Sequence, residues 1–409
     1  MIFARRLSRI RRVYHEYPQQ FWILIGAAFI DHVGGALLFP FFSLYITARF
    51  GVGMTTVGVL FGIYSVTAVV GSSIGGALTD RLGRKAMLIF GLVASAGTSL
   101  LMGFAGDLRL FFAAAVFVGL FANSGEPAQQ AMIADLLPER QRVHGYGLSR
   151  VVANLAVTIG PALGGMLAAR SYLILFIADA VTSVVTAVIV FLIVRETRPE
   201  RTLAEKSESF LQTFRGYGVA LADKIYMAFI FASMITALVY MQMNTTLAVF
   251  LRDIHHFPPQ GYGYLLSMNA ALVVLFQFPI TRRLSRYPSM AMMALGSVLL
   301  AVGFGMYAFV TSVMLFFVAM IVLTVGEMIV IPEAQAVVAR LAPETMRGRY
   351  MAVYGLSWTV PTIFGPTLAG AVMDYWDPRW VWHGALLFGL AAAAIYGTLF
   401  RYSRRRRTS

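Results

Sequence analysis

Five carboxylates interrupt long apolar stretches of the chain, and they are the residues best suited to chemistry. They are Asp31, Glu126, Asp179, Glu327 and Glu333. A charged side chain at the centre of a bilayer costs about 2.5–3.5 kcal/mol on insertion scales, so an acid kept there is a candidate for function. Such an acid can take up a proton on one side of a membrane and release it on the other when its hydration changes. The pattern therefore indicates proton-coupled transport.

The acids differ in how well their positions suit that role. Asp31 lies near the middle of its apolar stretch, and Glu126 and Glu327 each precede a proline within a second pair of stretches. We expect these three to bind protons or substrate. The alternative for each is a structural acid that is hydrogen-bonded within a helix bundle. Glu333 is a weaker candidate because it fits a hydrated helix end, and Asp179 is weaker because it fits a packing role.

The composition places all of these residues in an integral membrane protein. Of 409 residues, 58% are apolar and 13% are charged, whereas ordinary globular chains have roughly 45–50% and about 25%. At roughly 20 apolar residues per crossing, the chain has room for about a dozen helices. The absence of cysteine excludes disulfides, thiolate catalysis and cysteine-bound metals.

Twelve apolar stretches, separated by short polar or Gly/Pro-containing joints, predict an all-α fold of twelve transmembrane helices. They are residues 21–48, 54–79, 86–106, 109–135, 144–169, 171–194, 223–250, 259–281, 288–308, 311–339, 348–373 and 379–401. Lys and Arg number 28 at the two termini and in the even-numbered loops, against 5 in the odd loops. This asymmetry predicts cytoplasmic N- and C-termini in a bacterial inner membrane. The net charge of +14 then favours anionic membrane lipid over nucleic acid as a partner.

The two halves of the chain repeat each other. A shift of 205 residues lays 127–165 on 332–370 without a gap, and 12 of 39 positions are identical, including the pair Pro127 and Pro332. A repeat of six helices predicts two pseudo-symmetric six-helix bundles. The expected organisation is a basic tail (1–20), a first bundle (21–194), a linker with an amphipathic helix (195–222), a second bundle (223–401) and a basic tail (402–409).

A loop after the second stretch combines glycines, one acid and three bases: Gly76, Asp80, Arg81, Gly83, Arg84 and Lys85. One interpretation is a basic cytoplasmic loop with an ion pair at the helix end. The pattern Gly-x-Leu-x-Asp-Arg-x-Gly-Arg-Lys also closely resembles the signature of the major facilitator superfamily. That resemblance covers almost the whole chain. It implies the major facilitator fold and a latch role for Asp80 and Arg81.

The fifth stretch is dense in small residues around a proline: Gly147, Gly160, Pro161, Gly164 and Gly165. Small residues let helix backbones approach closely, and this alone explains part of the pattern. The spacing also resembles the fifth-helix motif of the superfamily's drug exporters, with Ala156 where that motif has glycine. This resemblance implies antiport. The fourth-helix arginine of many such exporters is missing, since Ala115 stands in its place.

A branch without that arginine, the LmrP-like multidrug exporters, is similar in two short segments, 326–332 and 133–135. In the superfamily, helices 1, 4, 7 and 10 line the central cavity, so Asp31, Glu126 and Glu327 are expected to face it. The branch resemblance implies a role in proton coupling or cationic-drug binding for Glu327. It adds Asp135 as a further candidate.

Aromatic, methionine and amide side chains suggest an adaptable pocket for lipophilic cations. The candidates are Phe41, Tyr240, Met243, Asn244 and Trp358. The alternative for each is packing or a lipid-facing position. Four tryptophans fit interfacial anchors: Trp22, Trp376, Trp380 and Trp382.

The function that these residues favour is export of hydrophobic or cationic drugs in exchange for protons by alternating access. A metabolite or nutrient carrier is the main alternative. Against it stand the motif in the fifth stretch and the lack of a base at mid-membrane depth. A membrane enzyme or a non-transporting scaffold fits less well, because no metal-ligand pair or nucleotide loop is present. We expect no cofactor, no metal and a monomer.

Overall fold

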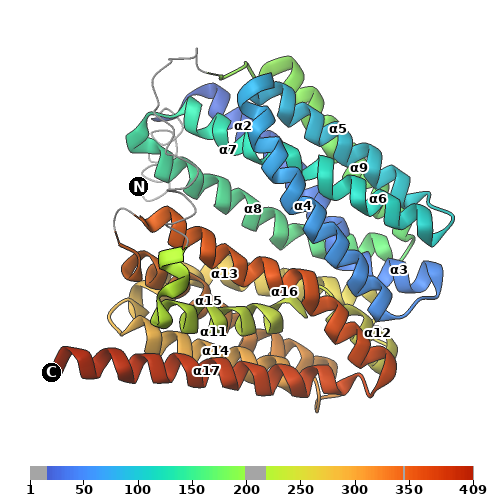
Figure 1. The fold of residues 1–409 in the computed structure, drawn as a ribbon. Helices are drawn as coiled ribbons and strands as arrows, with labels where there is room; N and C mark the ends of the chain where they lie inside the picture. The colour runs from blue at the N-terminus through green and yellow to red at the C-terminus, as the bar shows by residue number, and fades with distance from the viewer. Residues whose placement is uncertain (1–15, 199–217, 344–345, 409) are drawn as a thin grey trace, which may run out of the picture. The chain divides into compact units, whose positions relative to one another are not determined.

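The structure is a computed structural model that describes residues 16–198, 218–343 and 346–408, and these ranges form helices joined by turns (Figure 1). Eleven helical stretches in them are long and apolar enough to cross a membrane. A further long helix, α16 (Arg347–Tyr375), brings the passes to the expected twelve. In lipid every backbone polar group needs a partner within the protein, which is why apolar stretches of this length become helices.

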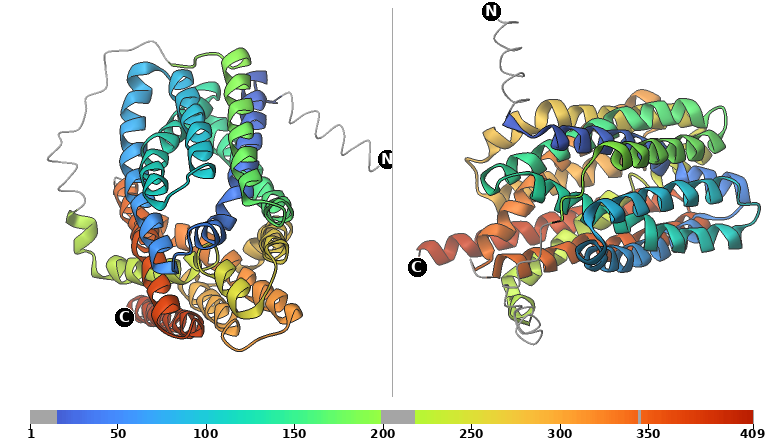
Figure 2. Two further views of the ribbon diagram at one scale, coloured as in Figure 1. Left: turned by 90° about the vertical axis from the view of Figure 1, so that its right-hand side faces the viewer. Right: turned by 90° about the horizontal axis from the view of Figure 1, so that it is seen from above.

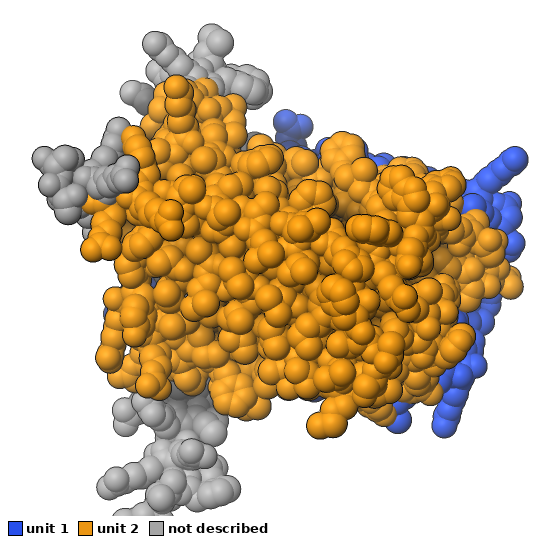
Figure 3. All heavy atoms as spheres, turned by 90° about the horizontal axis from the view of Figure 1, so that it is seen from below, with its two compact units in different colours: residues 1–39, 66–202 blue, residues 40–65, 203–409 orange. Residues whose placement is uncertain are grey.

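The chain divides into two compact units, which are coloured separately in Figure 3. Unit 1 comprises residues 1–39 and 66–202, and unit 2 comprises residues 40–65 and 203–409. The domain boundaries expected from the sequence remain predictions. Most of the expected linker helix and of the N-terminal tail lies outside the described residues.

Unit 1 is built from α2 and the helices that follow residue 65. They are α2 (Gln19–Leu38), the later part of α4 (Met54–Leu82), α5 (Arg84–Gly103), α6 (Leu108–Phe121), α7 (Glu126–Leu136), α8 (Glu139–Ala168) and α9 (Tyr172–Ile193). α2 packs against α8 and α9, and α5 packs against α9. Figures 1 and 2 show α2 beside α9.

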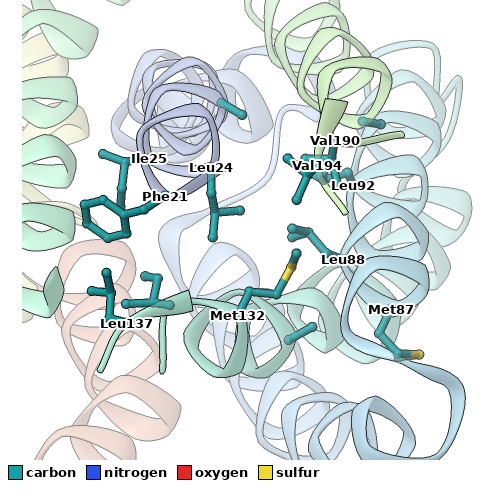
Figure 4. Close-up of a cluster of buried hydrophobic side chains, with 14 residues drawn as sticks. Phe21, Leu24, Ile25, Met87, Leu88, Leu92, Met132, Leu137, Val190 and Val194 are labelled. Atoms are coloured by element: carbon teal, nitrogen blue, oxygen red, sulfur yellow. The ribbon is translucent and has the colours of Figure 1, made fainter. Parts of the chain in front are cut away.

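A buried apolar cluster holds these helices together in unit 1. Phe21 and Leu24 from α2 meet Leu88 from α5, Met132 from α7 and Val190 from α9 (Figure 4). Side chains of three to seven carbons from four helices fill this interior, so each of these helices depends on the other three for its packing.

Unit 2 contains the remaining helices. They are α3 (Phe42–Phe50), the start of α4, α11 (Lys224–Met241), α12 (Leu247–His255), α13 (Pro259–Leu284), α14 (Ser289–Met306), α15 (Val313–Leu341), α16 and α17 (Arg379–Thr408). α14 packs against α15 and α17, and α11 packs against α16 and α17. Trp382 is fully buried and stacks on Phe304 with ring centroids 6.4 Å apart. Its expected role as an interfacial anchor is therefore wrong, because α17 turns this ring into the helix bundle.

The start of α4 joins unit 2 through one carboxylate of α16. Asp374 accepts hydrogen bonds from the backbone N–H groups of Met54 and Thr55, both at 2.7 Å. These N–H groups have no partner within their own helix. A Cβ at Gly58 would collide with the backbone of Thr367, so glycine is required for this close approach.

Three passes that the sequence predicts as continuous helices are interrupted. The first breaks at a short 3-10 turn, η1 (Phe39–Phe41), and the fourth at another, η2 (Ala122–Gly125). The seventh breaks between α11 and α12. Pro40 lies inside the first break, the second consists of small and polar residues, and the third is polar except for Met243. In the seventh pass Gln242 satisfies freed groups, since its amide donates to Leu238 O at 2.9 Å and accepts from Thr246 at 3.0 Å.

Candidate functional site

Glu327 lies in the middle of α15, and two side chains from neighbouring helices donate hydrogen bonds to it. The Tyr240 hydroxyl of α11 donates to Oε1 at 2.9 Å. The Asn269 amide of α13 donates to Oε2 at 2.8 Å. Glu327 itself is 9% exposed. Each oxygen of the acid thus has a partner of its own, which is what a buried carboxylate requires.

A small cavity of about 20 Å³ adjoins Glu327 within unit 2. Its lining comes from α11, α14, α15, α16 and α17, and consists of Ser233, Thr236, Ala237, Tyr240, Leu300, Glu327, Val330, Ile331, Ala334, Tyr354, Trp358 and Tyr396. The Trp358 ring meets Tyr240 edge-on, with centroids 5.8 Å apart, and its indole N–H donates to the Tyr354 hydroxyl at 3.3 Å. Glu327 is the one charged residue among these lining residues.

The structure brings together three residues that the sequence singles out, namely Glu327, Tyr240 and Trp358. It also adds Asn269 and Tyr396, which the sequence analysis missed. Asn269 carried a usable signal, since an amide in the middle of an apolar membrane helix needs a hydrogen-bonding partner.

The other pocket candidates lie elsewhere in unit 2. Phe41 is buried edge-on against the ring of Tyr262, with centroids 5.8 Å apart. The carbonyl of Met243 accepts the Tyr262 hydroxyl at 2.9 Å, which helps to hold the break in the seventh pass. Asn244 is half-buried in the same break. None of the three is among the residues that line the cavity next to Glu327.

Unit 1 holds a second group of buried polar side chains. Ser183 of α9 donates to Asp31 Oδ1 of α2 at 2.8 Å. Asp179, one turn earlier on α9, accepts from Ser99 of α5 and is 7% exposed. Among the described residues, no group of three acidic, histidine or cysteine side chains could hold a metal ion.

Glu126 is the first residue of α7 and is exposed. Because it follows η2, it stands at the beginning of a new helix, where the helix dipole favours an acid. This position differs from that of Glu327, which lies inside a continuous helix.

The loop between α4 and α5 turns at Gly83, whose φ of 108° favours glycine. Glu196, just after α9, accepts hydrogen bonds from the backbone N–H groups of Arg84 at 3.0 Å and Lys85 at 3.1 Å. It therefore caps the start of α5. Partial burial raises the pKa of Glu196, but backbone donors of residues 84, 85, 197 and 198 outweigh burial and lower it below 4.5.

The same loop carries ionic and polar contacts to two neighbouring helices. Arg84 pairs with Asp135 of α7 at 3.1 Å, and Thr197 donates to the same carboxylate at 3.2 Å. Lys85 donates to the Phe191 carbonyl of α9 at 2.7 Å. The carbonyl of Arg81 accepts a hydrogen bond from the Arg198 guanidinium at 2.9 Å. Gly76 lies within α4, and the side chain of Asp80 lies outside the described part of the structure.

Replacing Glu196 with glutamine is expected to destabilise unit 1 at neutral pH. The capping contribution is complete above pH 4.5 and is lost as the pH falls through the lowered pKa, so acid should remove the difference from wild type. Solvent screens this site, so we expect a loss near the lower end of the roughly 0.5–2 kcal/mol of helix caps. Thermal unfolding in detergent at neutral pH and well below 4.5 measures this, with Glu139→Gln at the exposed start of α8 as control. An equal difference at both pH values would contradict the prediction.

The glycine-rich motif of the fifth pass lies in α8, with Pro161 inside the helix. A Cβ at Gly160 would collide with Ala36 of α2, including its carbonyl carbon at 2.8 Å. A Cβ at Gly147 would meet nothing within 4 Å. Gly164 and Gly165 follow one turn later in α8. The motif thus contains at least one glycine that packing requires and one that it does not.

Membrane-length apolar helices and a partly open cavity with one acid define this chain as a membrane transport protein. The family profile described as Major Facilitator Superfamily matches residues 24–290 and again residues 243–409. The chain belongs to the Major Facilitator Superfamily.

Relatives in this superfamily transport different substrates. The chain is 29% identical over 370 residues to the Na(+), Li(+), K(+)/H(+) antiporter of Planococcus maritimus, covering 84% of this chain and 87% of that protein. It is 24% identical over 388 residues to the class H tetracycline resistance protein of Pasteurella multocida, covering 91% and 95%. A crystal structure of a mutant nucleoside transporter NupG superposes with a TM-score of 0.81 at 14% identity, covering 93% of this chain and 100% of that one. This last likeness concerns the fold alone.

Proposed function

We propose that this protein is a proton-coupled exporter of hydrophobic cations, similar to the LmrP-like multidrug exporters. The observation that carries the proposal is the cavity beside Glu327, where a single carboxylate lies among tyrosine and tryptophan rings. An uncompensated negative charge and aromatic faces both attract a positive charge. Each cation–π contact contributes about 0.5–2 kcal/mol, and most when water is excluded.

The chemistry of the cavity lining supports an organic cation as substrate. Ligand pockets are mostly apolar, with a few polar groups that orient the ligand. The residues around the cavity have this composition, and the helices around its space of about 20 Å³ must move apart to admit a drug-sized cation. No lining residue is a base, so an anionic substrate would find no partner there. This argues against the alternative of an anionic metabolite carrier.

Proton exchange would use the same acid. In the proposed cycle Glu327 binds the cation when ionised and releases it when protonated, and the two compact units move by alternating access. We include Asp31 as a second proton-binding acid in unit 1, with Glu126 and Asp135 as further candidates. The relative from Pasteurella multocida, a tetracycline resistance protein, is consistent with efflux of a drug-like molecule.

One observation favours a second candidate function, exchange of monovalent metal cations for protons. The relative from Planococcus maritimus carries the name of such an antiporter and is 29% identical to this chain. In unit 1, the carboxylates of Asp31 and Asp179 and the hydroxyls of Ser99 and Ser183 supply oxygen atoms of the kind that small cations prefer.

Transport by purified protein in liposomes with an imposed pH gradient separates these functions. Tetraphenylphosphonium and Na⁺ would be offered separately, while internal pH and cation content are followed together. Proton-driven movement of tetraphenylphosphonium supports the exporter, and movement of Na⁺ alone supports the second candidate. If neither cation moves with protons, both proposals are wrong, and a neutral metabolite becomes the substrate to test.

A further inference from the structure

The hydrogen bonds around Glu327 determine which of its oxygens can carry a proton. Thr324 lies one turn before Glu327 on α15, and its hydroxyl donates to the Met320 carbonyl at 2.6 Å. A hydroxyl has one hydrogen, so the Thr324 oxygen can only accept a second bond. The Asn269 side-chain atom 2.9 Å from that oxygen must therefore be a donor. This fixes the orientation of the amide, whose oxygen and nitrogen could otherwise exchange places.

With its orientation fixed, the amide nitrogen of Asn269 also faces Glu327 Oε2, at 2.8 Å. An amide NH₂ donates and does not accept. A proton on Oε2 would place a hydrogen against another hydrogen and would leave a buried donor without an acceptor, which costs about 1–3 kcal/mol. Oε2 is thus held as the acceptor oxygen whether Glu327 is ionised or protonated.

The other oxygen faces a partner that can reverse its role. The Tyr240 hydroxyl donates to Oε1 at 2.9 Å, but a phenol oxygen can also accept. When Oε1 gains a proton, the new O–H can donate to the Tyr240 oxygen. Tyr240 keeps its own proton, and that O–H must rotate away from Glu327.

We propose that Asn269 directs protonation of Glu327 to Oε1, and that Tyr240 then turns from donor to acceptor and presents its O–H to the cavity. The proton comes from a hydronium ion on the side to which the cavity opens and leaves a water molecule behind, and no other covalent bond changes. The ionised site offers a carboxylate, whereas the protonated site offers a neutral acid and a phenol donor. The geometry stands without the proposed function, and only its consequence for cation release rests on that function.

Among the described residues that line the cavity, none other than Glu327 carries a charge that could direct the proton. The groups facing it across the cavity from α11, α16 and α17 are the phenols of Tyr240, Tyr354 and Tyr396, and α14 contributes Leu300. On its own helix, Glu333 is paired with Arg340 at 3.8 Å and is absent from the cavity lining. The hydrogen-bond directions at the two oxygens therefore decide the outcome.

Infrared difference spectroscopy of the full chain in lipid nanodiscs, after a pH jump, tests the proposal without any substrate. The carbonyl band of protonated Glu327 is the band that Glu327→Gln removes. With the proton on Oε1, the carbonyl oxygen is Oε2 and accepts from Asn269. Asn269→Leu is expected to move the band to higher frequency, because the carbonyl loses its donor. A band that stays in place overturns the proposal.

The same helix offers a matched control. Gln277 of α13 also links α13 to α15, since its amide donates to the Met328 carbonyl at 2.9 Å. The same amide donates to Thr281 within α13 at 2.8 Å. Gln277→Leu is expected to leave the Glu327 band unchanged. A band moved equally by both variants would mean a general loosening of the helices and would overturn the specific role of Asn269.

A near-isosteric variant covers the case in which Asn269→Leu does not fold. Thr324→Val removes the acceptor that fixes the amide, so the amide can flip and the Glu327 band is expected to split into two components. One unchanged component contradicts the proposal. Tetraphenylphosphonium binding by the wild-type sample is measured in parallel. If the band responds as expected but no cation binds, the proton assignment holds and the proposed export function fails. If the cation binds but neither variant changes the band, the proton assignment fails and the proposed export function stands.

Discussion

Replacing Glu327 with glutamine is expected to abolish proton-driven movement of tetraphenylphosphonium and to weaken its binding by roughly 10–100-fold. Glutamine preserves the volume of the side chain but removes the one charge in the cavity lining. The loss of a charge-assisted contact of about 1.5–3 kcal/mol corresponds to this range of affinity. Binding to the purified protein and transport in liposomes with a pH gradient measure the two effects separately.

Glu333→Gln is the matched control for that experiment. Glu333 is a second buried acid of α15, it pairs with Arg340, and it does not line the cavity. We expect this variant to bind and transport the cation as wild type does. Coupled transport that survives in Glu327→Gln but fails in Glu333→Gln would contradict the prediction and identify Glu333 as the proton-binding acid. Coupled transport that survives in both variants would point to Asp31 in unit 1.

Replacing Gly160 with alanine is expected to destabilise unit 1 by about 1–3 kcal/mol, the usual cost of forcing a methyl group into a packed interior. The added Cβ would collide with Ala36 of α2, whose backbone cannot move without displacing that helix. Thermal unfolding in detergent measures the loss.

Gly147→Ala, in the same motif and the same helix, supplies the comparison. No atom lies within 4 Å of an added Cβ at Gly147. Alanine is a better helix former than glycine by up to about 1 kcal/mol, so stability should stay equal or rise. Equal destabilisation by both substitutions would show that the motif matters through backbone flexibility and not through contact with α2.

The fold follows from the sequence because the bilayer leaves few choices. A stretch of 20 or more apolar residues in lipid must satisfy its own backbone, and a helix is the simplest way to do so. The interruptions were harder to predict. At residues 242–246 the helix is interrupted, and side chains donate to backbone carbonyls there: the Gln242 amide to Leu238 and the Thr246 hydroxyl to Gln242. Hydropathy does not report such contacts.

The site was predictable in part, for a geometric reason. Glu327 stands out because a buried acid is costly in any membrane helix. Its partners lie 87 and 58 residues away in sequence, at Tyr240 and Asn269. Which residues face Glu327 depends on the rotation of α11 and α13 about their axes, where one residue changes the direction by about 100°. In a continuous helix Met243 would share a face with Tyr240, but α11 ends at Met241, so Met243 supports the helix break instead of the cavity.

The match between the two halves of the chain indicates which residues accompany the interruption of the fourth pass. Pro127 and Pro332 occupy matching positions, yet η2 interrupts the pass just before Pro127, whereas α15 runs unbroken through Pro332. Since both halves contain the proline, the proline alone does not cause the break. When the shift of 205 residues is extended to the residues just before it, Ala122, Asn123, Ser124, Gly125 and Glu126 stand opposite Glu327, Met328, Ile329, Val330 and Ile331. Small and polar residues thus accompany the broken helix, with its acid at the start of α7, whereas large apolar residues accompany the unbroken helix, with its acid in the middle of α15.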